Sequence, residues 1–284
     1  RRNPVSSGRV NRMAGVSTVR RFRWQVLAGM ALALAGLGAS ADVAAQSASR
    51  QTIKESASAR KAHEQILKAY GLYADQSLQE YVGQLGQRLA KQSELPDAEW
   101  KFVVLDDDSI NAFTTGCCYV YLHRGLLISL NSEAELASVL GHEIAHVTAK
   151  HVHEKLSREL AVSAVGTVGM VGGIVGGASG LTIDALGQVY GLTTGISGFA
   201  FDRAKEKEAD YVGLMYMARA GFDPQESVKV LEALELESAN DPTPPALLST
   251  HPTHPERILA LMDAMPKALA EREKGRASVV GGSR

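Results

Sequence analysis

The sequence predicts a mostly helical α+β domain in which a small β-sheet lies beside a helix that carries paired histidines. Helical spacing of apolar residues dominates the 284-residue chain, and only two short segments have the apolar character of strands. The chain is 45% hydrophobic and 21% charged, which is typical of a globular protein with a sizeable core. We expect one domain over residues 63–273, followed by a loose tail over 274–284.

The first 45 residues are typical of a targeting segment. They hold seven of the 30 basic residues and one of the 31 acidic residues, and a basic group at 20–23 precedes the apolar residues 24–39. The apolar stretch is short for a membrane span, and small residues suited to signal-peptide cleavage follow it. We therefore expect residues 1–45 to be a cleaved export signal, with an uncleaved anchor as the alternative. Residues 46–62 are expected to be a flexible leader.

The charge outside residues 1–45 bears on partners and location. Without that segment the formal charge is near −7, and an acidic chain lacks the basic surface on which nucleic-acid binding depends. We expect no nucleic-acid partner. The export signal predicts the bacterial periplasm as the location, and membrane association is a further expectation.

Two strands are expected in the first half of the domain. Residues 63–92 carry helical spacing, and Pro96 ends that region. Residues 100–105 then form a short apolar run, which predicts a buried strand, and three aspartates after it predict a turn. Residues 118–123 alternate in side-chain type, which predicts a second strand.

A strong helix is predicted from residue 132 to about residue 156. Ser132 and Glu135 fit a capping box, in which each side chain accepts a hydrogen bond from a backbone N–H that the helix leaves unpaired. Three further helices are expected at 203–220, 224–238 and 256–273.

Residues 161–183 are apolar and contain seven glycines. Their length permits a bilayer crossing, but glycine lowers helix propensity and leucine is nearly absent. We expect a glycine-rich helix, hairpin or lid that makes peripheral contact with a membrane. A membrane span is the alternative.

The helix predicted at 132–156 carries the sequence His142-Glu143-Ile144-Ala145-His146. Histidines at i and i+4 lie on one face of a helix, so His142 and His146 can bind one metal ion. Glu143 lies beside the open coordination position, where it can take a proton from a water that zinc activates. The alternative is two histidines on a solvated helix face, since this motif also occurs by chance.

A catalytic zinc site needs a third protein ligand. Glu206 and Asp210 share one face of the next predicted helix, so Glu206 can bind the metal while Asp210 accepts a hydrogen bond from a ligating histidine. Glu208 points elsewhere and is expected to be a surface charge. The alternative for this segment is a solvated charged face. A His-His-Glu set favours zinc but tolerates cobalt or manganese.

The remaining residues of metal-binding type are expected to play lesser parts. His151 and His153 follow on the first helix, but one helix face rarely supplies three ligands to a tetrahedral site, so we expect them to support a ligand or to lie at the surface. Cys117 and Cys118 are the only cysteines. Adjacent cysteines rarely form a disulfide bond or a zinc site, so we expect both to be packed as small residues.

Further motifs extend this pattern from about residue 60 to residue 265. In order they are Asn111-Ala112-Phe113, Arg124-Gly125-Leu126-Leu127, HEIAH at 142–146, EKEAD followed by Tyr211-Val212-Gly213, Ala220-Gly221-Phe222-Asp223-Pro224, and Ser249-Thr250-His251-Pro252 with Arg257-Ile258. Together they resemble the gluzincin peptidases related to HtpX and the CAAX prenyl endopeptidases. The resemblance is greatest to the exported branch that includes BepA, without its repeat domain.

The resemblance implies a zinc metalloendopeptidase that cleaves misfolded or stalled exported proteins, so its partners are unfolded or misassembled envelope polypeptides. It implies one zinc ion on His142, His146 and Glu206, with Glu143 catalytic and Asp210 hydrogen-bonded to a zinc-binding histidine. It places His251 near the metal, where it can stabilise the developing oxyanion or cap the zinc in a resting state.

The resemblance also implies that the strand near 116–122 binds an extended peptide by edge pairing. The residues involved are Gly116, Cys117, Cys118, Tyr119 and Val120. The family usually has two glycines where this chain has its cysteine pair, so the substrate edge departs from the family pattern at that point.

Three other interpretations stay open. They are a zinc-binding chaperone or regulator with little turnover, a zinc hydrolase of non-peptide amides, and a membrane-integrated peptidase that uses residues 161–183 as a span. The intact Glu143 argues against the first.

Overall fold

The computed structural model describes residues 57–116, 118–155, 157–158, 200–240 and 245–281. The chain divides into two compact units, Arg1–Gln51 and Thr52–Arg284, and all described residues belong to the second. The expected export signal, most of the expected leader and the glycine-rich residues 161–183 therefore lie outside the described residues.

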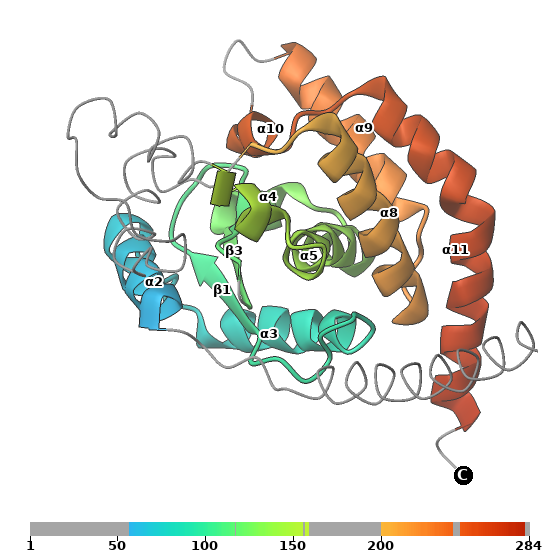
Figure 1. Ribbon diagram of the computed structural model, residues 1–284, viewed down its shortest axis with the longest axis horizontal. Coiled ribbons are helices and arrows are strands. Elements are labelled where there is room, and N and C mark those ends of the chain that lie inside the picture. The colour runs from blue at the N-terminus through green and yellow to red at the C-terminus, as the bar shows by residue number, and fades with distance from the viewer. Residues whose placement is uncertain (1–56, 117, 156, 159–199, 241–244, 282–284) are drawn as a thin grey trace, which may run out of the picture. The chain divides into compact units, whose positions relative to one another are not determined.

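The described residues form a mostly helical unit with one small sheet, which confirms the predicted fold class (Figure 1). The sheet has the strand order β1-β3-β2. β1 (Lys101–Leu105) is parallel to β3 (Tyr119–His123), and β2 (Ala112–Thr114) is antiparallel to β3. The strand predicted from the apolar run at 100–105 and the strand predicted from the alternation at 118–123 are thus both confirmed, whereas three residues are too few for β2 to show a periodic pattern.

Both faces of the sheet are buried. Side chains alternate along β1, so Phe102 and Val104 join the larger hydrophobic core while Val103 and Leu105 join a smaller one. The smaller core also contains Ile66 of helix α2 (Ala57–Tyr70), which covers that face. The larger core lies between the other face and helices α3 and α5. Burial on both faces explains why β1 reads as an apolar run rather than as an alternating strand.

The region predicted as helical over 63–92 contains two helices, α2 and α3 (Gln76–Ala90). Gly71 separates them with φ of 79°, a left-handed conformation that glycine adopts without strain and that commonly ends a helix. The expected flexible leader at 46–62 is wrong from residue 57 onward, because α2 begins there.

Helix α5 (Glu133–Thr148) carries the paired histidines and lies at the centre of the unit (Figure 1). The Ser132 side chain accepts a hydrogen bond from the backbone N–H of Glu135, as the capping box predicts. The Glu135 carboxylate accepts from the N–H of Asn131 instead of Ser132, at 2.6 Å. The helix ends earlier than predicted because Lys150 takes the left-handed conformation, with φ of 61°.

Further helices follow α5 and precede it in the chain. They include α4 (Arg124–Ser129), α8 (Arg203–Arg219), α9 (Glu226–Asn240), α10 (Ala246–Thr250) and α11 (Pro255–Gly281), and residues 151–155 are helical as well. α8 packs along α5, and α11 packs on the outer side of α8 (Figure 1). The sequence did not predict the short helices α4 and α10.

The loose tail expected from residue 274 is wrong as far as residue 281, because α11 continues to Gly281. A Cβ atom on Gly275 would lie 2.2 Å from the carbonyl oxygen of Arg219, so this part of α11 packs directly on the end of α8. Within the described ranges, no helix has both the length and the apolar character that a bilayer crossing requires.

Helices α5 and α8 touch backbone to backbone at a pair of glycines. A Cβ on Gly213 would lie 2.7 Å from the carbonyl carbon of Gly141 and 2.7 Å from the backbone nitrogen of His142. Any side chain here forces the two helices apart. The glycines therefore set the distance between the helix that carries His142 and the helix that carries Glu206.

We expect Gly213→Ala to lower the free energy of unfolding by about 1–3 kcal/mol, because the added methyl overpacks this contact. Gly83→Ala in α3 is the matched control. A Cβ at Gly83 has no neighbour within 4 Å, so the better helix propensity of alanine should stabilise that variant by about 0.5–1 kcal/mol. Urea unfolding of both variants measures the difference. Equal stability of the two would mean that the glycine contact does not hold α5 and α8 together.

Candidate metal centre

Four side chains of metal-binding type converge from three helices. His142 and His146 come from α5, Glu206 comes from α8, and His251 follows α10 directly, and one ligand atom of each lies within 4.8 Å of the others. The Nε2 atoms of His142 and His146 are 3.0 Å apart. Oε2 of Glu206 lies 3.4 Å from the His142 nitrogen, and Oε1 lies 3.4 Å from the His146 nitrogen. Donors that share a tetrahedral zinc at about 2.1 Å are separated by roughly 3.4 Å, so this arrangement matches a shared metal ion.

The buried carboxylates also fit a cation. Among the described residues, both side-chain oxygens of Glu143 and Oε2 of Glu206 have no hydrogen-bond partner. Both side chains are about 1% exposed, and an ionised carboxylate is costly to bury unless positive charge lies close to it. Nη1 of Arg257 lies 2.9 Å from Oε2 of Glu206 and Nε2 of His251 lies 3.3 Å from Oε1 of Glu143, and a divalent metal ion among the histidines would add to that positive charge.

Asp210 and Arg257 contact the metal-binding side chains and hold them in position. Oδ1 of Asp210 lies 3.0 Å from Nδ1 of His142, which is the contact that orients a ligating histidine. Arg257 donates two hydrogen bonds of 2.7 Å to the Asp210 carboxylate, and its Nη1 lies 2.9 Å from Oε2 of Glu206. It also donates to the carbonyl oxygen of Pro252, beside His251. One buried guanidinium therefore fixes α8 and the loop after α10 together.

His146 is enclosed by two further side chains. Nδ1 of His151 lies 3.1 Å from Nδ1 of His146, and the Phe201 ring stacks on the His146 ring with centroids 4.0 Å apart. His151 is buried and its Nε2 lies 3.2 Å from the exposed Glu208 carboxylate, whereas His153 is exposed. Of the two extra histidines, His151 is thus the one that contacts the cluster.

The neighbours of each group shift its pKa. Burial opposes the charged form of His142, but hydrogen bonds to Asp210 and Glu206 outweigh burial and raise the pKa of His142 to about 10. Burial likewise opposes ionisation of Glu206, yet His251 and the two α5 histidines hold its pKa well below the ordinary value. Burial raises the pKa of Glu143 and lowers that of His146. A histidine ligates a metal in its neutral form, so a metal ion and a proton compete for His142.

The substrate edge predicted near 116–122 is wrong in position, because β3 is the central strand of the sheet. Tyr119 pairs with Lys101 on one side, and Val120 pairs with Phe102 on one side and Thr114 on the other. A strand with a neighbour on each side has no edge to offer an incoming peptide. Strand order depends on tertiary packing, which the local pattern of β3 does not contain.

The residues before β3 form the turn that joins it to β2. Gly116 and Cys118 both have φ of 76°, a conformation that favours glycine and strains cysteine. Cys118 is buried in the larger core, so it packs as a small residue as predicted. Cys117 lies outside the described residues.

Arg257 and Phe201 are the contacts of this site to which sequence analysis assigned no role. Arg257 belonged to a motif of the family resemblance, and that was its only signal. No local pattern marked Phe201.

Comparison with known proteins identifies a family and several relatives of similar sequence. The model of peptidase family M48 matches residues 76–265. The beta-barrel assembly-enhancing protease of Yersinia pestis is 34% identical over 194 residues, which are 66% of this chain and 39% of that protein. The protein of that name from Escherichia coli (strain K12) is 32% identical with the same coverage. The mitochondrial metalloendopeptidase OMA1 of Schizosaccharomyces pombe is 31% identical over 222 residues, 76% of this chain and 62% of that protein.

The chain therefore spans about two fifths of the length of these bacterial relatives. The family match nevertheless runs from α3 into the first part of α11 and includes every residue of the donor cluster. This chain belongs to peptidase family M48, in the branch that contains the beta-barrel assembly-enhancing proteases.

Proposed function

We propose that this chain is a zinc-dependent endopeptidase, with His142, His146 and Glu206 as the metal ligands and Glu143 as the general base. One observation carries the proposal. The Glu143 carboxylate is buried and has no hydrogen-bond partner among the described residues, beside a cluster of three histidines and a carboxylate. A metal site that only stabilises the fold does not require a buried carboxylate without a hydrogen-bond partner, whereas hydrolysis requires a general base at that position.

In the proposed reaction Glu143 moves the protons. A zinc ion bound by the cluster supplies Lewis acidity to the scissile carbonyl and to the attacking water. Glu143 accepts a proton from that water and delivers it to the leaving amine. Asp210 keeps the His142 ring in place through Nδ1, and Arg257 keeps Asp210 in place.

His251 supports a resting state of the site. Its Nδ1 lies 3.1 Å from Oε1 of Glu206, and its Nε2 lies 3.3 Å from Oε1 of Glu143. The ring thus stands between the ligand carboxylate and the general base, where a substrate carbonyl and a water have to bind. We propose that His251 caps the metal until substrate displaces it.

His251→Ala is expected to raise the rate of casein cleavage several-fold while the metal content stays the same, because the cap is lost and three ligands remain. Metal content measured by elemental analysis and cleavage measured on the same preparation test this. A lower metal content would make His251 a permanent ligand. Slower cleavage with full metal would assign it to oxyanion stabilisation instead.

We propose that the peptide pairs with β2 rather than with β3. β2 is the outer strand that contacts α5, and Asn111 at its start is buried with neither side-chain polar atom hydrogen-bonded. A buried amide without partners indicates a ligand, and strand addition accepts many sequences because it uses backbone hydrogen bonds. All three residues of β2 are buried.

The location and natural substrates are proposed from the N-terminal pattern and the relatives. Residues 1–45 have the pattern of an export signal, and the bacterial relatives are named for enhancing beta-barrel assembly. We propose that the protein acts in the bacterial periplasm on misfolded or stalled envelope proteins, with residues 161–183 in peripheral contact with the membrane.

Chelation tests the proposed function directly. We expect the purified full chain to cleave casein, to lose this activity when a chelator removes the metal, and to regain it when zinc is added. The melting temperature should fall on chelation and recover with zinc, because the metal binds the folded site and not the unfolded chain. Cleavage that continues without metal would contradict the proposal. Bound metal without cleavage would favour a metal-binding chaperone.

A further inference from the structure

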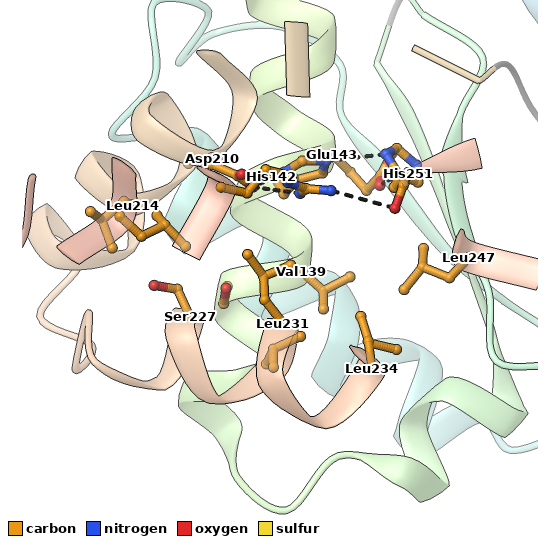
Figure 2. Close-up of a pocket in the computed structure, with 15 residues that line it drawn as sticks. Val139, His142, Glu143, Asp210, Leu214, Ser227, Leu231, Leu234, Leu247 and His251 are labelled. Atoms are coloured by element: carbon orange, nitrogen blue, oxygen red, sulfur yellow. Dashed lines mark hydrogen bonds and ion pairs between the residues drawn. The ribbon is translucent and has the colours of Figure 1, made fainter. Parts of the chain in front are cut away.

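The two paired histidines of α5 are held in different ways. Asp210 meets Nδ1 of His142 directly, with its Oδ1 at 3.0 Å (Figure 2). The same nitrogen of His146 meets a second imidazole instead, because it lies 3.1 Å from Nδ1 of His151. The other ring nitrogen of His151, Nε2, lies 3.2 Å from Oε2 of Glu208. His146 is therefore connected to a carboxylate through one intervening ring.

A break in the helix brings His151 to this position. If α5 continued past Thr148, a residue five positions after His146 would point about 140° away from it around the helix axis. The left-handed Lys150, with φ of 61°, ends the helix instead, and a second helical segment begins at residue 151. His151 is 1% exposed there. Backbone strain of the kind seen at Lys150 tends to occur at functional sites.

The chemistry of a neutral imidazole assigns the proton in each of these contacts. Nε2 of His146 faces the other metal-binding groups, at 3.0 Å from Nε2 of His142 and 3.4 Å from Oε1 of Glu206. A histidine that binds a metal through Nε2 is neutral and carries its proton on Nδ1. That N–H donates to Nδ1 of His151, so His151 carries its own proton on Nε2 and donates to Glu208. Each hydrogen bond then has one donor and one acceptor.

The burial of His146 makes the acceptor on His151 necessary. The His146 side chain is fully buried, and the Phe201 ring covers it at a centroid distance of 4.0 Å. Phe201 also lies beside the His151 ring, with centroids 6.0 Å apart. A buried N–H that has no acceptor is costly. The neutral His151 ring is therefore the acceptor that allows His146 to keep its proton on Nδ1.

We propose that His151 and Glu208 are positioning residues for the metal ligand His146. Glu208 holds the tautomer of His151, and His151 holds the His146 ring with Nε2 toward the metal. The inference rests on the metal site proposed above. Hydrogen-bond partners of ligating histidines set the affinity for the metal. The segment EKEAD thus supplies a ligand in Glu206 and a carboxylate for each histidine, in Asp210 and in Glu208, although the Glu208 side chain is 59% exposed.

His151→Phe tests the first contact, because phenylalanine keeps a ring of similar size and removes the acceptor. We expect it to weaken zinc binding by about 10–100-fold, the usual effect of losing a hydrogen-bond partner of a ligating histidine. His153→Phe is the matched control, since His153 is exposed and contacts Ser157 rather than the cluster. It should bind zinc as wild type does. Competition with a chromophoric zinc chelator measures the affinity of the full chain.

Glu208→Ala tests the second contact. We expect zinc binding to weaken by roughly threefold to tenfold, less than for a direct partner, because Glu208 is exposed and acts through His151. Glu154→Ala is the matched control. The Glu154 side chain is 56% exposed and pairs with Lys205 instead of a histidine, so this variant should keep the wild-type affinity. The double variant His151→Phe, Glu208→Ala should bind zinc as His151→Phe alone does.

Urea unfolding of the zinc-free variants separates positioning from packing. A His151→Phe variant that loses stability without zinc but keeps the wild-type zinc affinity would assign His151 to packing and overturn the proposal. Additive losses of affinity in the double variant would mean that Glu208 acts through its charge and not through His151, which would overturn its role. If wild type binds zinc with the expected losses in the variants but cleaves no casein, the positioning role is supported and the peptidase is not. A wild type that binds no zinc would overturn both.

Discussion

Glu143→Gln is expected to lower kcat for peptide cleavage by about 10²–10⁴-fold, the usual contribution of a general acid–base group. Glutamine has nearly the same shape as glutamate but cannot accept a proton at neutral pH. Glu143 is not one of the four clustered donor residues, so the variant should bind metal as wild type does. Steady-state kinetics and metal analysis on the same preparation measure both properties.

The structure also predicts that Glu143→Gln does not lower the stability of the metal-free protein. An uncharged amide is cheaper to bury than a carboxylate without hydrogen bonds, so the metal-free variant should be at least as stable as metal-free wild type. Glu232→Gln on the exposed face of α9 is the control for removing one negative charge. Full activity in Glu143→Gln would exclude Glu143 as the base, and loss of metal would assign it to the metal site.

Local sequence pattern predicted the elements that are long or strongly apolar. α5 has a cap and a clear helical period, and β1 has four buried residues in a row, so both were found. β2 has three residues and α10 has five. Segments this short do not show a recognisable strand or helix period in the sequence. The order of the strands in the sheet could not be predicted from the sequence, because strand pairing depends on contacts between segments rather than on the sequence of a single segment.

In the candidate metal centre, too, local spacing predicts some contacts and tertiary packing determines the others. The spacing of His142 and His146 predicts their common face, because both lie on one helix whose geometry is fixed. Asp210 follows from the same argument on α8. Arg257 lies 47 residues after Asp210, and only the packing of α11 on α8 brings its guanidinium to the two carboxylates. No local pattern predicts such a contact.

Arg257→Met is expected to lower the free energy of unfolding of the metal-free protein by about 3–5 kcal/mol, the cost of removing one partner from a buried ion pair. Arg257 is 3% exposed and contacts both Asp210 and Glu206. Its loss removes the guanidinium charge from two buried carboxylates. The metal-bound protein should lose less stability, because the metal still balances the charge of Glu206. Urea unfolding with and without zinc measures this difference.

A second substitution tests whether the stability lost in Arg257→Met comes from the Asp210 carboxylate that no longer has its arginine partner. Asp210→Asn in the Arg257→Met background removes the unpaired carboxylate, so the double variant should regain part of the lost stability. Arg257→Lys should recover less, because one ammonium cannot reproduce the bidentate contact with Asp210 together with the approach to Glu206. A cost below about 1 kcal/mol for Arg257→Met would resemble a solvent-exposed pair and would contradict the buried position of this arginine. If Arg257→Met loses about 3–5 kcal/mol equally with and without zinc, Arg257 does not contribute to the metal centre. Its role would then be to stabilise the packing of α11 on α8.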